Sequence, residues 1–473
     1  MTARRLYPTL LAALALAGCS MAPRYSAPAS PVPGTFPGQP AAVSSGKPAA
    51  APSGPAAADL EWKSFYADPR LQRVLDLALA NNRDFRVAGL NIEKAAAYYR
   101  IQRAALLPTV NAGGSYYRGS VSATTGGMVP GMGLSVGISS WEMDFFGRLN
   151  SLRQEALQNY LATEQAQRSS RIALLAQVAN GYLTLAGDQE SLKLAQATVD
   201  SQGSTYDLTQ RRFLVGAASE IDARRAQISL ESARVDLASY TRTVALDRSN
   251  LDLLVGTTVP ADLLPENLSG IAPLREDFAV GLPSEVLLSR PDILQAEDQL
   301  KAANADIGAA RAALFPSITL TTTAGTSGAS LNAMFRSGSN YWLIYPQINL
   351  PIFDYGSRRA KLKTSKIERE IYVAQYEKAI QTAFKEVRDA LAQRDTLRQQ
   401  RVAQAALAQA SEVTYRLTKA RYDVGMDSSL SVLDAQRTSN SAEQTLISLR
   451  QQELGNLVTL YKVVGGGTRG GKP

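Results

Sequence analysis

The sequence contains no histidine and only one cysteine among 473 residues. Without histidine, the chain cannot carry a Ser-His or Cys-His catalytic pair, an imidazole metal site or a histidine pH switch. A single cysteine excludes an internal disulfide and a zinc site built from thiolates. Charged residues make up only 19% of the chain. The 50 basic and 42 acidic residues are interspersed, so the sequence predicts no nucleic-acid-binding face. Because histidine is absent and cysteine occurs once, it also predicts no metal site and no enzyme.

The one cysteine follows a leader of secretory type. Arg4 and Arg5 precede an apolar run over residues 6–18, which is too short for the about 20 residues that span a bilayer. The run ends in Leu-Ala-Gly-Cys, which resembles a bacterial lipobox, in which the cysteine thiol is acylated before the leader is removed. We therefore expect residues 1–18 to be a signal peptide and Cys19 to carry an N-palmitoyl, S-diacylglycerol lipid. An ordinary signal peptide with an incidental cysteine is the alternative.

The segment after the cysteine lacks the composition of a folded domain. Residues 22–58 hold nine prolines and only two charged residues, Arg24 and Lys47. Such a segment cannot bury enough apolar surface to fold alone. We expect residues 19–60 to form an acylated, extended tether, with folded sequence from Glu61 onward.

The rest of the chain repeats itself once. Matching residue pairs recur at a nearly constant offset, which indicates one structural half used twice rather than a solenoid of short repeats. We expect a first repeat over 61–256, a connector over 257–288, a second repeat over 289–465 and a disordered tail over 466–473. The matching pairs include Arg103 with Arg311, Pro108 with Pro316, Tyr206 with Tyr415, Val215-Gly216 with Val424-Gly425, and Val255-Gly256 with Val464-Gly465.

Each repeat has the same internal order. A predicted helix, over 70–104 or 291–312, precedes a stretch rich in glycine, serine, threonine and aromatic residues. A long proline-poor segment with apolar residues at helical spacing follows, and glycine marks its turn, as expected for a helical hairpin. The glycine-marked turns contain Val215, Gly216, Val424 and Gly425.

The middle stretch of each repeat alternates apolar and polar residues. This alternation, flanked by aromatic residues, is typical of transmembrane β-strands. Two such hairpins give four strands per chain, and an open sheet edge is not tolerated in hydrocarbon because its backbone groups stay unpaired. The strands therefore predict an oligomer, and three chains would supply twelve strands. The alternating residues include Leu134, Val136, Ile138, Ile318, Leu320, Ile344 and Ile348.

Several motifs together resemble one family, the TolC-like outer-membrane efflux proteins. The lipobox and the duplication resemble in particular its lipoprotein branch, which serves drug pumps of the resistance-nodulation-division (RND) type. The resemblance covers about residues 60–465. It is carried by Ser289-Arg290-Pro291-Asp292-Ile293, by the run from Ala303 to Ile318, by Leu350 to Gly356, and by Leu433-Asp434-Ala435-Gln436.

The resemblance implies a mixed α and β membrane protein, internally duplicated. A homotrimer would place a twelve-stranded β-barrel in the outer membrane, continuous with a long α-helical barrel in the periplasm. The chain would be lipid-anchored and membrane-spanning. It would give drugs and other small molecules a passive exit, without a cofactor. Its implied partners are a periplasmic adaptor protein, an inner-membrane RND pump and outer-membrane lipid.

The same resemblance implies a gate at the periplasmic end. Asp434 would line a constriction as a ring of three carboxylates, which repel one another and attract cations. Asp222 would accept a hydrogen bond from Tyr422, and Leu430 would add an apolar constriction. A basic latch residue of some members corresponds to Asp427 here, so that link is expected to be absent or made differently. The adaptor would dock on the turns that contain Val215, Gly216, Val424 and Gly425.

Two other functions compete with an efflux duct. The same architecture could serve protein export by a type I secretion system. A periplasmic coiled-coil lipoprotein that forms no channel is the second alternative, and it predicts no barrel and no conductance.

Overall fold

The computed structural model describes residues 21–33, 57–117, 131–276 and 284–468. The signal peptide, Cys19 and most of the expected tether lie outside these residues. The chain divides into two compact units. The first contains residues 90–165 and 294–378 with the N-terminal segment up to residue 29, and the second contains 30–89, 166–293 and 379–473.

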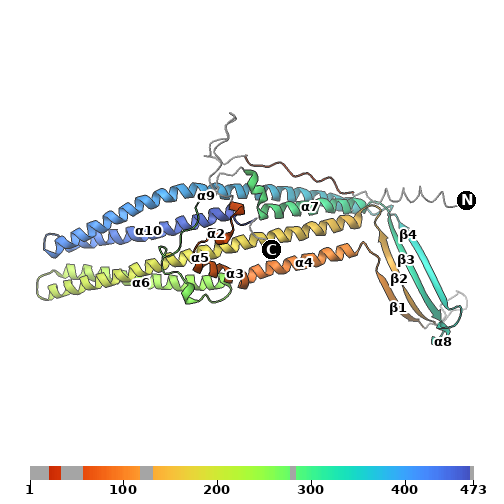
Figure 1. Cartoon of the computed structure of the whole chain (residues 1–473), viewed down its shortest axis with the longest axis horizontal. Helices are drawn as coiled ribbons and strands as arrows, with labels where there is room; N and C mark the ends of the chain where they lie inside the picture. Colours follow the sequence, from red (N-terminus) through yellow and green to blue (C-terminus); the bar gives the residue numbers. More distant parts are fainter. Residues whose placement is uncertain (1–20, 34–56, 118–130, 277–283, 469–473) are drawn as a thin grey trace, which may run out of the picture. The chain divides into compact units, whose positions relative to one another are not determined.

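The first unit is built around the four predicted strands. They are β1 (Val110–Tyr117), β2 (Gly131–Met143), β3 (Ser317–Gly328) and β4 (Asn340–Asn349). They form one antiparallel sheet in the order β1-β2-β3-β4, so β1 and β4 are its edges (Figure 1). Pro346 lies within β4, where an edge strand tolerates a missing N–H.

The two central strands approach unusually closely at a pair of glycines. A Cβ atom added to Gly137 of β2 would lie 2.0 Å from the carbonyl oxygen of Thr322. One added to Gly325 of β3 would lie 2.3 Å from the carbonyl oxygen of Leu134. The two glycines are two residue pairs apart in the β2–β3 register. Each strand therefore packs its backbone into the space that a side chain would fill on the other.

Helices precede and follow each hairpin, as the duplication predicts. The segment expected as one helix over 70–104 is two helices, α3 (Pro69–Asn81) and α4 (Arg83–Ala104). Asn82 separates them, because its backbone is extended and its side chain accepts a hydrogen bond from Phe85 N–H, which caps α4. The corresponding helix of the second repeat, α7 (Pro291–Ala312), has the predicted bounds.

The two long helices start in the same way. The Asp144 side chain accepts hydrogen bonds from the N–H groups of Leu149 and Asn150 at the start of α5 (Arg148–Leu214). Asp354 plays the same part at α9 (Ser357–Asp423), where it accepts from Gly356 and Arg358. Carboxylates at these positions satisfy N–H groups that have no partner within the helix. The duplication thus extends to the caps.

Two helical hairpins dominate the second unit. α5 turns back into α6 (Glu220–Val255), and α9 turns back into α10 (Ser429–Val463) (Figure 1). α5 and α9 have 67 residues each, which corresponds to about 100 Å of helix. The remaining short elements are η1 (Ala57–Asp59), α2 (Trp62–Phe65), η2 (Ala261–Leu263), η3 (Ser284–Ser289) and α8 (Leu331–Met334).

An aromatic core in the second unit joins the chain's early and late segments. Phe65 stacks on Tyr461 with ring centroids 4.0 Å apart, and the Tyr461 hydroxyl donates to the carbonyl of Leu60. The described part of the connector packs apolar side chains inward, among them Val259 and Leu263. These contacts fix the start of the folded chain beside the end of α10.

The C-terminal tail begins in a turn. Gly466 N–H donates to the carbonyl of Tyr461, and Gly467 N–H donates to that of Ala57. Residues 469–473 of the predicted disordered tail lie outside the described residues. Among the helices of the described ranges, none is both long and apolar enough to cross a membrane.

Candidate functional site

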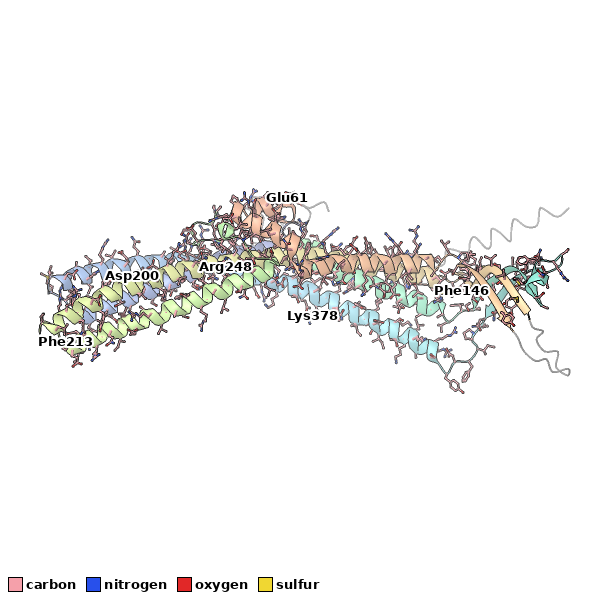
Figure 2. All side chains as sticks on the ribbon, turned by 90° about the horizontal axis from the view of Figure 1, so that it is seen from below. Glu61, Phe146, Asp200, Phe213, Arg248 and Lys378 are labelled. Carbon is pink, nitrogen blue, oxygen red and sulfur yellow. The ribbon has the colours of Figure 1, made fainter. Side chains whose placement is uncertain are left out.

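The sequence-predicted gate and docking residues gather at one end of the second unit, where both helical hairpins turn. Phe213, at the end of α5, marks this region (Figure 2). Gly216 and Gly425 have φ angles of +75° and +81°, a conformation that suits glycine. In both turns, an N–H bonds back to a carbonyl five residues earlier, from Ala217 to Arg212 and from Met426 to Arg421. The helical hairpins of the two repeats therefore reverse direction in the same glycine-closed turn.

The turns expose apolar side chains. Val215 is 79% exposed and Val424 is 69% exposed. The space around the two glycines is open, because an added Cβ would meet no heavy atom within 4 Å. The turns thus require glycine for backbone conformation alone, and their apolar surface is free in the single chain to contact another protein.

Asp222 links the two hairpins by a different contact from the predicted one. Its carboxylate accepts hydrogen bonds from Ser429 at 2.8 Å and from Ser219 at 2.6 Å. These bonds lower the pKa of the Asp222 carboxyl, with Ser219 making the larger contribution. Tyr422, its predicted partner, instead accepts a hydrogen bond from Arg212 at 3.2 Å. The link between α6 and α10 therefore runs through a serine.

Asp427, at the position of the basic latch residue of some family members, forms an ion pair within its own turn. Its carboxylate accepts from Nε and Nη2 of Arg421 at 2.7 and 3.3 Å. These bonds lower the pKa of the Asp427 carboxyl. Both residues belong to the α9–α10 turn, so this ion pair closes the turn locally and does not join two hairpins.

Asp434 and Leu430 share one exposed face of α10. They are four residues apart, which places them on the same side of a helix. Leu430 is 52% exposed and Asp434 is also exposed, whereas Val432 and Leu433 between them are buried. In a single chain, the α10 face that carries both predicted constriction residues is therefore uncovered.

The seam between α5 and α10 is made of hydrogen bonds between uncharged side chains, which the sequence motifs did not predict. Gln202 donates to Gln436 at 2.9 Å, and Gln436 donates to Ser201 at 3.2 Å. Further along, Asn440 donates to Thr198 at 3.2 Å. The helical spacing of polar residues on both helices was the available signal. Amide and hydroxyl groups can exchange partners without leaving a buried charge, so this seam tolerates small movements of α10.

An ion pair fixes α10 at the far end of that seam. Arg450 donates to Glu190 of α5 at 3.0 Å and to Ser269 of the connector at 2.6 Å. Glu190 also accepts from the N–H of Leu268 at 3.1 Å. α10 is thus held by charge near its C-terminal half and by neutral groups toward the turn.

Among the described residues of the first unit, the Glu155 carboxyl has a strongly raised pKa. Burial, together with the smaller effects of the nearby carboxylates of Asp306 and Glu368, raises the pKa of Glu155 to about 7. The three residues come from α5, α7 and α9. In the described part of the chain, no group of three or more cysteine or acidic side chains is arranged to hold a metal ion.

The Glu155 shift predicts a pH dependence of stability. The pKa of an unfolded glutamate is about 4.3, so the folded state keeps its proton while the unfolded state loses it. Stability should therefore fall as the pH rises from about 4.3 to 7. We expect Glu155→Gln to raise the melting temperature at pH 8 and to have little effect at pH 4, as measured by circular dichroism. Glu231→Gln, at an exposed position of α6, controls for the loss of one negative charge. A melting temperature that is equally altered at both pH values would contradict the assignment.

Comparison with known proteins agrees with this architecture. The family model described as outer membrane efflux protein matches residues 74–257 and 282–466. The antibiotic efflux pump outer membrane protein ArpC of Pseudomonas putida is 47% identical over 460 residues, which cover 96% of this chain and 94% of ArpC. The toluene efflux pump outer membrane protein TtgC of Pseudomonas putida is 47% identical with the same coverage.

A solved structure shows the same fold. The open state of the MtrE outer membrane channel of Neisseria gonorrhoeae superimposes with a TM-score of 0.84 at 36% identity. The match covers 96% of this chain and 99% of the MtrE chain. The two matched blocks of the family model also begin 208 residues apart, in agreement with the duplication. The chain therefore belongs to the outer membrane efflux protein family.

Proposed function

We propose that three copies of this chain close a twelve-stranded barrel and form a passive exit duct for small molecules across the outer membrane. The four-stranded sheet is the observation that carries this proposal. β1 and β4 are its edges, and β4 exposes Trp342, Ile344 and Ile348 at 76%, 60% and 69%. An open edge in hydrocarbon leaves backbone groups unpaired at several kcal/mol each, whereas pairing β4 of one copy with β1 of the next removes every edge.

Purified protein in planar bilayers tests this proposal directly. Discrete channel conductance, together with a trimeric mass in detergent, is the expected result. A monomer without conductance would instead support a lipoprotein that forms no channel.

We infer that the partners are a periplasmic adaptor protein and an inner-membrane RND pump. The exposed apolar turns around Val215 and Val424 suit a protein partner, and the relatives ArpC and TtgC are named as outer membrane proteins of efflux pumps. Those names refer to antibiotics and toluene, which favours export of small molecules over protein secretion. Deletion of the gene should sensitise the cell to such compounds and leave protein secretion unchanged.

The gate in this proposal is the exposed α10 face with Asp434 and Leu430. Three copies would bring these faces together around one axis, where carboxylates attract cations and apolar side chains narrow the path. The hydrogen bond between Ser429 and Asp222 ties α10 to α6 and would oppose its outward movement.

Loss of this tie should increase the open population of the gate. We expect Ser429→Ala and Asp222→Ala each to raise the mean conductance about fivefold, since one net hydrogen bond is worth about 1 kcal/mol. The double variant should match Asp222→Ala, because the bond to Ser429 is already absent in that single variant, which also loses the local bond from Ser219. Asp434→Ala should raise conductance independently by removing the carboxylate ring. Additive effects of Ser429→Ala and Asp222→Ala in bilayer recordings would show that they do not act through one bond.

We also propose that Cys19 carries the lipid. Cys19→Ala should abolish incorporation of labelled palmitate, because the chain contains no second cysteine. Ser20→Ala, at the next position, keeps the thiol and serves as the control that should still be labelled. Palmitate label in the Cys19→Ala protein would refute the lipidation.

A further inference from the structure

The segment that follows Cys19 lies along one face of α7. We call residues 21–29 the strap; Figure 1 shows it beside this helix. The Met21 carbonyl accepts a hydrogen bond from Arg311 at 3.2 Å, and the Pro23 carbonyl accepts one from Asn304 at 2.8 Å. Asn304 is only 5% exposed. Two buried or half-buried side chains of α7 are therefore committed to the strap backbone.

The middle of the contact depends on the absence of a side chain. A Cβ atom on Gly308 would lie 2.8 Å from the nitrogen and 2.9 Å from the Cα of Ala22. Because these are backbone atoms of the strap, they cannot move aside unless the strap moves. Gly308 thus lets strap and helix approach to a distance that no other residue permits.

Tyr25 anchors the other end of the contact. Its hydroxyl donates to Glu297 at 3.2 Å, and the Lys301 ammonium lies 5.7 Å from its ring centroid. Lys301 also pairs with Glu297 at 3.1 Å. The phenol is thus held by a hydrogen bond and by a cation–π contact. All the contacts fall at spacings of three and four, on one helix face made of Glu297, Lys301, Asn304, Gly308 and Arg311.

We propose that this face of α7 is a docking track for the strap and that it holds the lipid attachment point beside the end of α7, where the chain continues into β3. The proposal rests on the acylation of Cys19 proposed above. Cys19 is two residues from Met21, and two extended residues reach at most about 7 Å. Among the described residues, the next buried one after the strap is Ala57. A flexible chain from there to Cys19 would let the lipid wander over roughly 35 Å.

Trypsin provides a direct test, because Arg24 lies within the strap. Cleavage after Arg24 releases the lipopeptide Cys19–Arg24 and creates a new N-terminus at residue 25, both of which mass spectrometry detects. Rates are measured on the full-length protein in detergent and divided by those of free peptides covering residues 20–30. We expect strong protection of the wild-type bond. Tyr25→Ala should raise the normalised rate about tenfold, and Tyr25→Phe, which keeps the ring over Lys301, should raise it less. Cleavage after Arg469, which precedes a glycine, should be the same in all three proteins.

A second variant tests the close approach separately. Gly308→Ala also places its Cβ 2.7 Å from the Ser151 hydroxyl, so it is compared in a Ser151→Ala background, where that oxygen is absent. The double variant should lose protection of Arg24, and Ser151→Ala alone should keep it.

Two results would overturn the docking track. One is wild-type cleavage after Arg24 at the free-peptide rate, and the other is equal normalised rates in the wild type, Tyr25→Ala and the Gly308→Ala double variant. Absence of palmitate label on a wild-type chain that still protects Arg24 would refute the acylation alone. The new N-terminus at residue 25 reports strap docking in either case.

Discussion

The variant Gly137→Val is expected to abolish barrel formation. No backbone movement within the strand pair can accommodate its side chain, because the Cβ alone would lie 2.0 Å from Thr322 O and 2.8 Å from Thr323 Cα. Both atoms belong to the β3 backbone, so β2 and β3 must separate. Loss of the backbone bonds around this position, with no water to replace them in hydrocarbon, costs several kcal/mol for each unpaired group. The outer-membrane fraction should contain no heat-resistant trimer, and bilayer recordings should show no channels.

Gly113→Val provides a matched control on the neighbouring strand. A Cβ at Gly113 of β1 would meet only the Ser135 hydroxyl, at 3.9 Å, which is an ordinary contact. This variant should still assemble, because a Cβ at this position has room. It is a matched control because it enlarges the same residue type by the same amount within the same sheet. Normal assembly of Gly137→Val would show that the β2–β3 register is wrong at this position.

Much of the fold could be predicted from the sequence because it depends on repeated local signals. Alternation predicted four strands, and proline-poor segments with glycine turns predicted two helical hairpins. The break at Asn82 was not predicted, since it depends on a side chain that caps α4 and also donates to the carbonyl of Leu254, far away in the sequence. The close approach of β2 and β3 at Gly137 and Gly325 was missed for a related reason. It depends on the register of the two strands, and alternation alone does not specify which residues face each other.

The motifs identified the residues proposed for the gate but not their hydrogen-bond partners. The motifs led to Asp222, Tyr422, Asp427 and Asp434, and these residues do lie at the hairpin ends. The partners could not be derived in the same way. Ser429 rather than Tyr422 meets Asp222, because side-chain direction at the start of α10 depends on how the two hairpins pack. The uncharged α5–α10 seam was missed because glutamine and serine on a helix surface look like ordinary solvated residues until the partner helix is known.

The Arg290 motif illustrates how family resemblance and physical role differ. The motif indicated the family without indicating what Arg290 does. The side chain is 8% exposed, and it donates to Asp292 at 2.6 Å, to Glu386 of α9 at 2.8 Å and to the carbonyl of Val463 at 2.8 Å. One guanidinium thus joins the start of α7, the middle of α9 and the end of α10 in the second unit. Arginine suits this role because its planar donors reach several acceptors in fixed directions.

Arg290→Ala should therefore be strongly destabilising. It leaves two carboxylates and a carbonyl without their common donor, and loss of one partner from a buried ion pair costs about 3–5 kcal/mol. We expect the lower end, about 3 kcal/mol, because Asp292 and Glu386 are more than one-third exposed and water can reach them. The melting temperature of the helices, followed by circular dichroism, should fall by about 5 °C or more.

Arg290→Lys should give an intermediate fall, since an ammonium keeps the charge but cannot direct its donors to three acceptors. Arg234→Ala, which removes an exposed arginine paired with Glu231, should leave the melting temperature unchanged within error. Equal effects of Arg290→Ala and Arg234→Ala would mean that Arg290 does not join these helices.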